Sequence, residues 1–365
     1  MSVSYLKGGL KHTMRIVNLI ILFGLAVQLI ACGSEDSGNS DSDVVAETDS
    51  STDTSDENTT NVIVFDPNLF SSFSQISPFE LVDCTLSNGE NSQCYTAVYE
   101  NVRETRTVIC PENVGEVGGL GIYDGTTNPG IRVLDDDLWA DFATDGYDII
   151  NDDGTINIQV PEGGPGSGFI EAGSGISGSC LDAELDETYQ ITYTIPAYPT
   201  KATSVATTNS LEYWGLSLDG FPFAEKPPGA ASQVGVAIPG LDSCGGHPQP
   251  DGPYHYHLVP HVIDDLLAQN DITKVVCEYI PQTDNTILGY ARDGFAIYGT
   301  RDADDTIPND LDQCQGHTHS SDDDNETYHY HITNELNPST DTGYTNILPC
   351  TVGETAENNG FARYE

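Results

Sequence analysis

The chain has 365 residues, of which 57 are acidic and 12 are basic, so its formal net charge at pH 7 is −45. This excess of acid argues against nucleic acid as a partner, because binding to phosphates depends on a basic surface. It indicates instead either cations held near the surface or adaptation to salty surroundings, where ions screen the self-repulsion of the chain.

The first 31 residues have the pattern of an export signal peptide. Basic residues within 7–15 precede an apolar run, 16–30, which is shorter than the roughly 20 residues that a membrane-spanning helix needs. The run ends in the letters LIAC, which resemble a bacterial lipobox. This resemblance implies that Cys32 becomes the lipidated first residue of the mature protein. It also implies an extracytoplasmic protein with a membrane anchor, and Gly33 favours the outer membrane or the cell surface.

Residues 32–61 consist mainly of Ser, Thr, Asn, Asp and Glu and contain no basic or aromatic residue. Such a segment has too little apolar surface to offset the entropy lost on ordering, so we expect an acidic disordered tether. Two interpretations of its acidity have equal weight. It serves either as a spacer that lifts the folded body off the lipid headgroups or simply as a solubilising segment.

From residue 62 onward, short β-branched or aromatic runs alternate with clusters of Gly, Pro, Asn and Asp. This pattern predicts a mainly β fold, sandwich or barrel-like, with few short helices. Only residues 261–270 have a helical pattern. The length allows two regions of domain size. We expect an N-terminal β region over 62–194, which contains no histidine, and a second domain over 195–365.

The second domain contains the word Tyr-His-Tyr-His twice, at 254–257 and 328–331. Similar neighbours precede both copies in the same order: GLSLDGF and then LDSCGGH in the first, GYARDGF and then LDQCQGH in the second. These matches predict an internal duplication, with copies at about 211–280 and 285–352, in the mainly β region near the C-terminus.

Successive side chains of a strand point to opposite faces, so each Tyr-His-Tyr-His word places two histidines on one face and two tyrosines on the other. An upstream histidine offers each pair a third imidazole. Three imidazoles with an open position suit zinc or copper. The predicted metal ligands are His247, His255 and His257 in the first copy, and His317, His329 and His331 with His319 as an extra candidate in the second.

These histidines form either two separate sites or one site shared across a pseudo-twofold axis. The alternative is a strand whose histidines are solvated or bonded within the core, without metal. For His261, which has no counterpart in the second copy, we expect a place at a helix start or on the surface. The four tyrosines are expected to pack in the core.

Aspartates precede glycine at matching places in the two copies, at Asp219 and Asp293. Asp-Gly is a strong hairpin signal. Each aspartate could equally orient a ligating imidazole or act as a base beside bound water, and Asp293 is the candidate catalytic base. Asp242 and Asp312, two residues before cysteines, share this ambiguity.

Three acidic runs could hold calcium through carboxylate oxygens, at 135–137, 302–305 and 322–324, although none has the spacing of a known calcium loop.

Eight cysteines remain besides Cys32, and an even number in an exported chain indicates disulfides. The duplication restricts the pairing, because matching cysteines precede the histidines of both copies and further cysteines follow them by 20 and 19 residues. The expected pairs are Cys84–Cys94, Cys110–Cys180, Cys244–Cys277 and Cys314–Cys350.

The stretch from about Ile195 to Cys350 resembles the YHYH domain of exported bacterial proteins. The resemblance rests on IPAYPTKATS, GLSLDGFPF, DSCGGHPQPDGPYHYH, GYARDGFAIYG and LDQCQGHTHSSDDDNETYHYH, in that order. It implies asparagine at the place of Asp219, which favours Asp293 as a base. The family is named for its motif, so the resemblance implies a domain and no mechanism.

Three function classes follow from these observations. The first is a surface-anchored lipoprotein that binds copper or zinc through the duplicated histidines. The second is a metal-dependent enzyme, either a hydrolase with Asp293 as base or a copper oxidoreductase using a nearby tyrosine. The third is a structural or adhesion protein without metal.

Overall fold

The computed structural model describes residues 65–103, 108–160, 178–208, 213–224, 237–249, 252–259, 268, 272, 285–318, 328–332, 348–357 and 361–364. All of them belong to one compact unit, Thr59–Glu365. The described elements are strands apart from one α-helix and one 3-10 turn, η1 (Pro67–Leu69). The predicted helix at 261–270 and the acidic segment at 32–61 lie outside what the structure describes.

An eight-stranded sheet forms the centre of the fold, in the order β12-β13-β10-β9-β14-β15-β17-β16. Its first half contains β9 (Tyr213–Ser217), β10 (Pro222–Ala224), β12 (Gly246–Gln249) and β13 (Gly252–Tyr256). Its second half contains β14 (Ile287–Ala291), β15 (Ala296–Tyr298), β16 (Gly316–His317) and β17 (His329–His331). Each half contains the strands of one sequence copy.

The two halves have the same connections and meet at the antiparallel pair β9–β14. In each half one hairpin (β9–β10, β14–β15) is antiparallel, its second strand pairs parallel with the tyrosine-histidine strand, and that strand pairs antiparallel with the outermost one. The order of strands is therefore symmetric about the centre of the sheet. This arrangement confirms the internal duplication predicted for the C-terminal region.

Even the irregularities of the sheet are repeated. Register shifts occur at Trp214 in β9 and at Leu288 in β14, where each residue is an extra one opposite its partner strand. Both side chains are buried in the same core. The turns after β9 and β14 contain Gly220 and Gly294 at φ of 93° and 89°, values that favour glycine, so the two Asp-Gly words form hairpin turns as expected.

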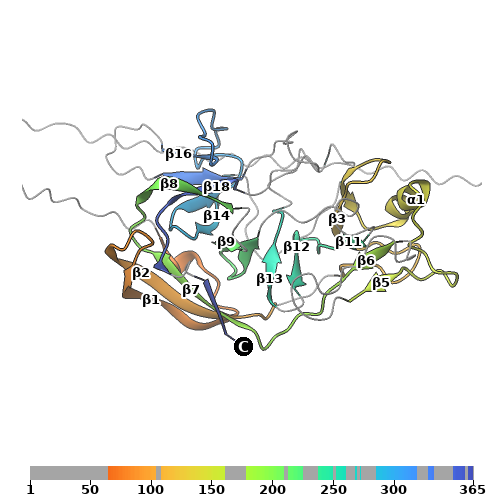
Figure 1. The fold of residues 1–365 in the computed structure, drawn as a ribbon, viewed down its shortest axis with the longest axis horizontal. Coiled ribbons are helices and arrows are strands. Elements are labelled where there is room, and N and C mark those ends of the chain that lie inside the picture. The colour runs from red at the N-terminus through yellow and green to blue at the C-terminus, as the bar shows by residue number, and fades with distance from the viewer. Residues whose placement is uncertain are drawn as a thin grey trace, which may run out of the picture. The chain divides into compact units, whose positions relative to one another are not determined.

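A second sheet packs against the central one. It consists of β1 (Gln75–Thr85), β2 (Asn91–Glu100), β7 (Gln190–Pro196) and β19 (Phe361–Tyr364), in that order (Figure 1). Tyr99 and Tyr193 of this sheet share a core with Leu216 and Tyr290 of the central sheet. Among the described strands the sheets pack face to face and do not close into a barrel, so the fold is sandwich-like.

The opposite face of the central sheet contains the tyrosines of both copies. They share a core with Trp214 and with Val352 of β18 (Cys350–Gly353), which pairs with β8 (Lys201–Thr207). The tyrosine side chains are at most 5% exposed: Tyr254, Tyr256, Tyr328 and Tyr330. They are core residues, as predicted.

A third group of elements surrounds the helix α1 (Asp136–Thr144). It contains the hairpin of β3 (Leu120–Tyr123) and β4 (Gly130–Val133), and a small sheet of β11 (Ala237–Pro239), β6 (Ser179–Leu181) and β5 (Ile158–Gln159) (Figure 1). Trp139 and Phe142 of the helix are buried against these strands.

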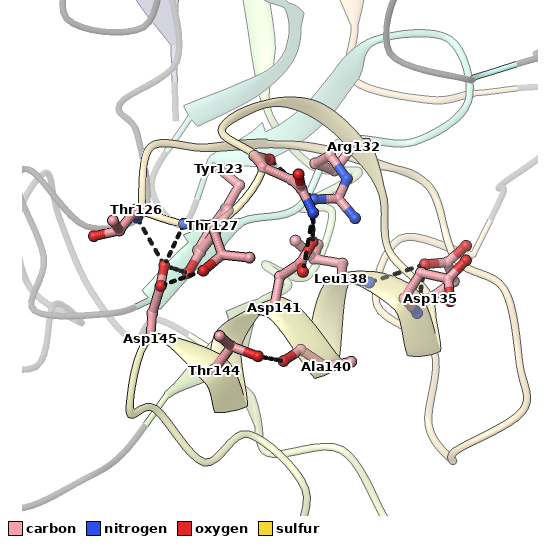
Figure 2. A network of polar contacts seen from close by, with 12 residues as sticks. Tyr123, Thr126, Thr127, Arg132, Asp135, Leu138, Ala140, Asp141, Thr144 and Asp145 are labelled. Carbon is pink, nitrogen blue, oxygen red and sulfur yellow. Dashed lines mark hydrogen bonds and ion pairs between the residues drawn. The ribbon is translucent and has the colours of Figure 1, made fainter.

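Polar contacts fix the helix to the hairpin (Figure 2). The Asp145 carboxylate accepts bonds from the Tyr123 hydroxyl at 2.5 Å and from the backbone N–H of Thr126 and Thr127 at 2.7 and 3.0 Å. Arg132 and Asp141 form an ion pair at 2.5 Å.

The regions before and after position 194 share their sheets. β7 crosses that position, and β11 of the later region pairs with β6 of the earlier one. In addition, the Tyr254 backbone N–H donates to the side chain of Asn101 at 2.8 Å. The residues before 194 therefore contribute directly to the framework that holds the tyrosine-histidine strands.

Disulfides join Cys84 to Cys94, Cys110 to Cys180 and Cys314 to Cys350. These are three of the four pairs expected from the sequence. Cys244 is also disulfide-bonded, and its expected partner, Cys277, lies outside the described residues. Across the described ranges, no helix is long and apolar enough to cross a lipid bilayer.

Candidate metal centres

The turn that presents the first histidine of each copy is built around an aspartate. Asp242 Oδ1 accepts bonds from the backbone N–H of Cys244 at 2.8 Å and of Gly246 at 3.3 Å. Asp312 repeats both bonds in the second copy, at 2.7 and 3.2 Å. Each carboxylate also accepts the hydroxyl of the first tyrosine of its copy. These two aspartates shape the turn and hold the tyrosine strand beside it.

The first cluster consists of His247, His255 and His257. His247 on β12 lies directly opposite His255 on β13. Strand alternation places His257 on the same face as His255. The Nε2 atoms of His255 and His257 are 3.0 Å apart, and those of His257 and His247 are 3.2 Å apart. Three ring nitrogens thus converge on one point.

Hydrogen bonds determine which nitrogen of two of these rings carries the proton. His247 Nδ1 lies 2.9 Å from the Gly240 carbonyl oxygen, and His255 Nδ1 lies 3.0 Å from that of Pro253. A carbonyl oxygen only accepts, so each Nδ1 is the donor and each Nε2 presents a lone pair. The lone pairs of His247 and His255 both lie beside His257 Nε2, an arrangement in which one cation could bind all three nitrogens.

Burial keeps these imidazoles in the neutral form that binds metal. It lowers the pKa of His247 to about 3, and the neighbouring His255 lowers it further. It lowers the pKa of His255 to about 4, against the weaker opposing effect of the Pro253 carbonyl. Neutral imidazole at pH 7 is the form that coordinates zinc or copper.

The second cluster consists of His317, His329, His331 and Asp302. His317 on β16 lies opposite His329 on β17, as in the first copy. His317 Nε2 is 3.0 Å from His329 Nε2 and 3.1 Å from His331 Nε2. Asp302 Oδ1 lies 3.1, 3.4 and 3.2 Å from the Nε2 atoms of His317, His329 and His331.

The remaining ring nitrogens of the second cluster are also held. His331 Nδ1 lies 2.8 Å from the Gly299 carbonyl oxygen, and His317 Nδ1 lies 2.7 Å from Asp310 Oδ1. A carboxylate on the far nitrogen of a histidine orients the ring and makes it a more basic ligand. Burial lowers the pKa of His331 to about 4.

The spacing of the donor atoms fits a small tetrahedral ion. An ion bound at about 2.0–2.1 Å holds its four ligand atoms about 3.3 Å apart. The distances within the second cluster are 3.0–3.4 Å. Both groups have every donor atom within 4.8 Å of the others. The geometry therefore provides one three-ligand and one four-ligand candidate site.

Residues 192–308 match a family model described as YHYH protein. The chain carries a YHYH domain. The chain has no significant match among curated proteins or solved structures.

The matched part of the YHYH domain includes the first cluster and Asp302, and it ends before His317. The strands beyond it complete the same sheet, since β17 pairs with β15. The four-ligand cluster thus combines a carboxylate within the match with three imidazoles that follow it.

The two clusters are separate sites. They lie on the outermost strand pairs of the sheet, β12–β13 and β16–β17, with four strands between. At about 4.8 Å per strand, the inner strands of the two clusters, β13 and β17, are about 24 Å apart along the sheet. Of the two arrangements left open by the sequence, the structure has the one with a site in each half.

The aspartates of the Asp-Gly turns lie on the tyrosine side of the YHYH domain. Asp293 Oδ2 accepts bonds from the Tyr330 hydroxyl at 2.6 Å and the Gly353 N–H at 2.8 Å. Asp219 Oδ2 accepts the Tyr256 hydroxyl at 2.6 Å. Burial raises the pKa of both carboxyls. The structure thus brings Asp293, the candidate base, to a tyrosine and not to the histidine nitrogens.

Asp302 is the ligand candidate that the sequence did not single out. In the sequence it stands out only as part of the acidic run 302–305. The offset between copies is 74 positions at Asp219 and Asp293 but 70 at His247 and His317, so Asp302, which lies between, has no fixed counterpart in the first copy. Comparison of the two sequence copies therefore identifies the histidines but does not identify this carboxylate.

The remaining residues of the acidic runs do not belong to the histidine clusters in the part of the chain that the structure describes. Asp135 is the N-cap of α1 and accepts bonds from the backbone of Asp137 and Leu138 at 3.1 and 3.2 Å, so the run at 135–137 begins a helix. Asp304 accepts bonds from Thr306 in a turn. The run at 322–324 lies outside the described residues, as do His261 and His319.

Proposed function

We propose that this protein is a lipoprotein of the cell envelope that binds a transition metal, zinc or copper, at the two histidine clusters of its YHYH domain. The observation that carries the proposal is the convergence of ring nitrogens whose partner nitrogens are occupied by carbonyl or carboxylate oxygens. Ring nitrogens held in this way present lone pairs toward a common point, as metal coordination requires.

The ligand types favour zinc or copper over harder ions. Imidazole suits both metals, whereas calcium and magnesium prefer sites made of oxygen ligands. A set of three imidazoles, with or without one carboxylate, is typical of tetrahedral zinc. The cysteines found in disulfides are not available as thiolate ligands.

The proposal of a lipid anchor rests on the N-terminal sequence. The basic stretch, the short apolar run and Cys32 together resemble a lipoprotein signal. The acidic segment that follows would separate the YHYH domain from the lipid surface. An anchored protein outside the cytoplasm would also be in the oxidising surroundings where disulfides persist.

Metal analysis of the exported protein tests the metal proposal. We expect two equivalents in the wild-type protein, and one after His255→Ala or His329→Ala, because each substitution removes a ligand from one cluster. Asp153→Ala is the control, since this exposed carboxylate is described and belongs to neither cluster, and it should leave the metal content unchanged. Less than about half an equivalent of any transition metal in the wild type would contradict the proposal.

A further inference from the structure

One loop supplies three groups to the second cluster. It follows β15, and all of it, residues 299–310, lies in the described segment 285–318. The Gly299 carbonyl oxygen lies 2.8 Å from His331 Nδ1, and Asp302 Oδ1 lies 3.1–3.4 Å from the Nε2 atoms of the three histidines. Asp310 Oδ1 lies 2.7 Å from His317 Nδ1. The loop therefore contacts the cluster both at its centre and behind two of its rings.

Asp310 differs from Asp302 in its position. Its side chain is 61% exposed, whereas the His317 side chain is 5% exposed. A carboxylate only accepts hydrogen bonds, so His317 donates from Nδ1, and its Nε2 then presents a lone pair toward His329 and His331. An exposed aspartate is ionised at neutral pH. Asp310 therefore places a negative charge behind a ring whose other nitrogen faces the ion.

The matching histidine of the first copy has a neutral partner. His247 has the same register position in the first copy as His317 in the second. The oxygen behind His247 belongs to the Gly240 carbonyl group, which lies 2.9 Å from Nδ1 and carries no net charge. A carboxylate in this place orients the ring and makes it a more basic ligand, and removal of such a partner typically costs about 10–100-fold in metal affinity.

We infer that Asp310 is a positioning residue that raises the metal affinity of the second cluster through the His317 ring, without itself binding the ion. This inference rests on the proposed metal binding. It makes the affinity of one of two related sites depend on an exposed charge outside its ligand set. A change at position 310 therefore alters metal binding without removing a ligand.

Zinc affinity measured at one cluster at a time tests this role. In the full mature protein, His255→Ala removes a ligand from the first cluster, so competition with a chromophoric chelator measures zinc binding at the second. Adding Asp310→Asn should weaken that binding about 10–100-fold, because asparagine keeps an oxygen that accepts from His317 Nδ1 but carries no charge. Asp305→Asn, in the same loop and with a largely exposed side chain, should leave the affinity unchanged.

A second pair of variants distinguishes this role from a general loss of structure. Asp310→Asn combined with His329→Ala should leave zinc binding at the first cluster unchanged, because Asp310 bonds to a histidine of the other cluster. A loss of similar size at the first cluster, or a loss of less than about threefold at the second, would overturn the inference while leaving metal binding intact. If neither zinc nor copper binds to the wild-type protein, the proposed function fails, and this inference fails with it.

Discussion

Each of the four core tyrosines donates its hydroxyl hydrogen to a carboxylate, which is buried in three cases and exposed in the case of Asp312. The pairs are Tyr254–Asp242, Tyr256–Asp219, Tyr328–Asp312 and Tyr330–Asp293. A buried tyrosine hydroxyl needs an acceptor, so every histidine strand is fixed from behind by two such bonds. Cation–π contacts also hold one tyrosine in each copy. Arg103 Cζ lies 3.7 Å from the centre of the Tyr254 ring, and Lys201 Nζ lies 4.3 Å from the centre of the Tyr328 ring.

Asp293→Asn tests whether this residue holds the framework. We expect a loss of about 1–3 kcal/mol in unfolding free energy at acidic pH, because asparagine has one acceptor oxygen in place of two. Either the Tyr330 and Gly353 donors or the Phe295 N–H then lose their acceptor. Burial raises the pKa of Asp293 above its ordinary value of 3.8. Its contribution to stability is therefore fully present below that value and is lost as the pH rises through the raised pKa. The loss in the variant should shrink accordingly between about pH 4.5 and about pH 8.

Urea unfolding at both pH values measures this effect, and Asp305→Asn is an exposed control. The metal content should stay at two equivalents, because Asp293 belongs to neither cluster. A stability loss that grows with pH would show that the carboxylate is stabilised in its charged form.

At the residue scale, the tyrosine and histidine faces could be predicted because strand alternation depends on sequence spacing alone. Asp302 could not be predicted, because it reaches the cluster from the loop after β15 and lies 15 positions before His317. Its role depends on how the chain folds back, which the spacing of the residues does not reveal.

At the scale of elements, the duplication extends to the turns, the bulges and the bonds that Asp242 and Asp312 accept, but one turn residue differs between the copies. The turn before β12 has Gly245 at φ of 82°, and the turn before β16 has Gln315 at φ of 63°. A side chain is tolerated at Gln315 in the second copy. In the first copy, a Cβ on Gly245 would overlap the Leu258 carbonyl oxygen.

Gly245→Ala should therefore lower the unfolding free energy by about 1–3 kcal/mol and weaken metal binding at the first cluster, since the turn presents His247. Gln315→Ala is the matched control, because its backbone already accommodates a Cβ, and it should change stability by less than about 0.5 kcal/mol. Denaturant unfolding and metal titration measure both effects. Equal losses in the two variants would show that the close approach to Leu258 does not matter.

Strand content could be predicted from composition, whereas α1 could not. Its first turn is the acidic run at 135–137, and only the fold shows that Asp135 caps a helix. The boundary expected at 194 is likewise not a break in the fold, because β7 passes through it. Whether a domain ends at a given position depends on which distant segments pair with each other. The spacing of apolar residues within one segment does not reveal that pairing.

At the scale of the whole molecule, the sequence before the YHYH domain has two roles in our proposal. Its structured part completes the sandwich through β1 and β2. Its N-terminal part would attach the protein to a membrane at Cys32.

Cys32→Ser tests the anchor. The variant should lose incorporation of labelled fatty acid and move from the membrane fraction to the soluble fraction, because a serine hydroxyl does not replace the lipidated thiol. Its metal content should not change. Ser34→Ala is the neighbouring control and should remain with the membrane. A variant that stays membrane-bound without the cysteine would contradict lipidation at this position.

The symmetric order of the central sheet has a consequence for association between copies of the protein. A sheet edge is where a second chain can add a strand, and long flat edges invite aggregation. Both edges here are short strands, β12 and β16, and each contributes a histidine to a cluster. A metal ion at either edge would clamp that strand to its neighbour. Metal ions bound at the two clusters would thus make it harder for another copy of the protein to add a strand to either edge of the sheet.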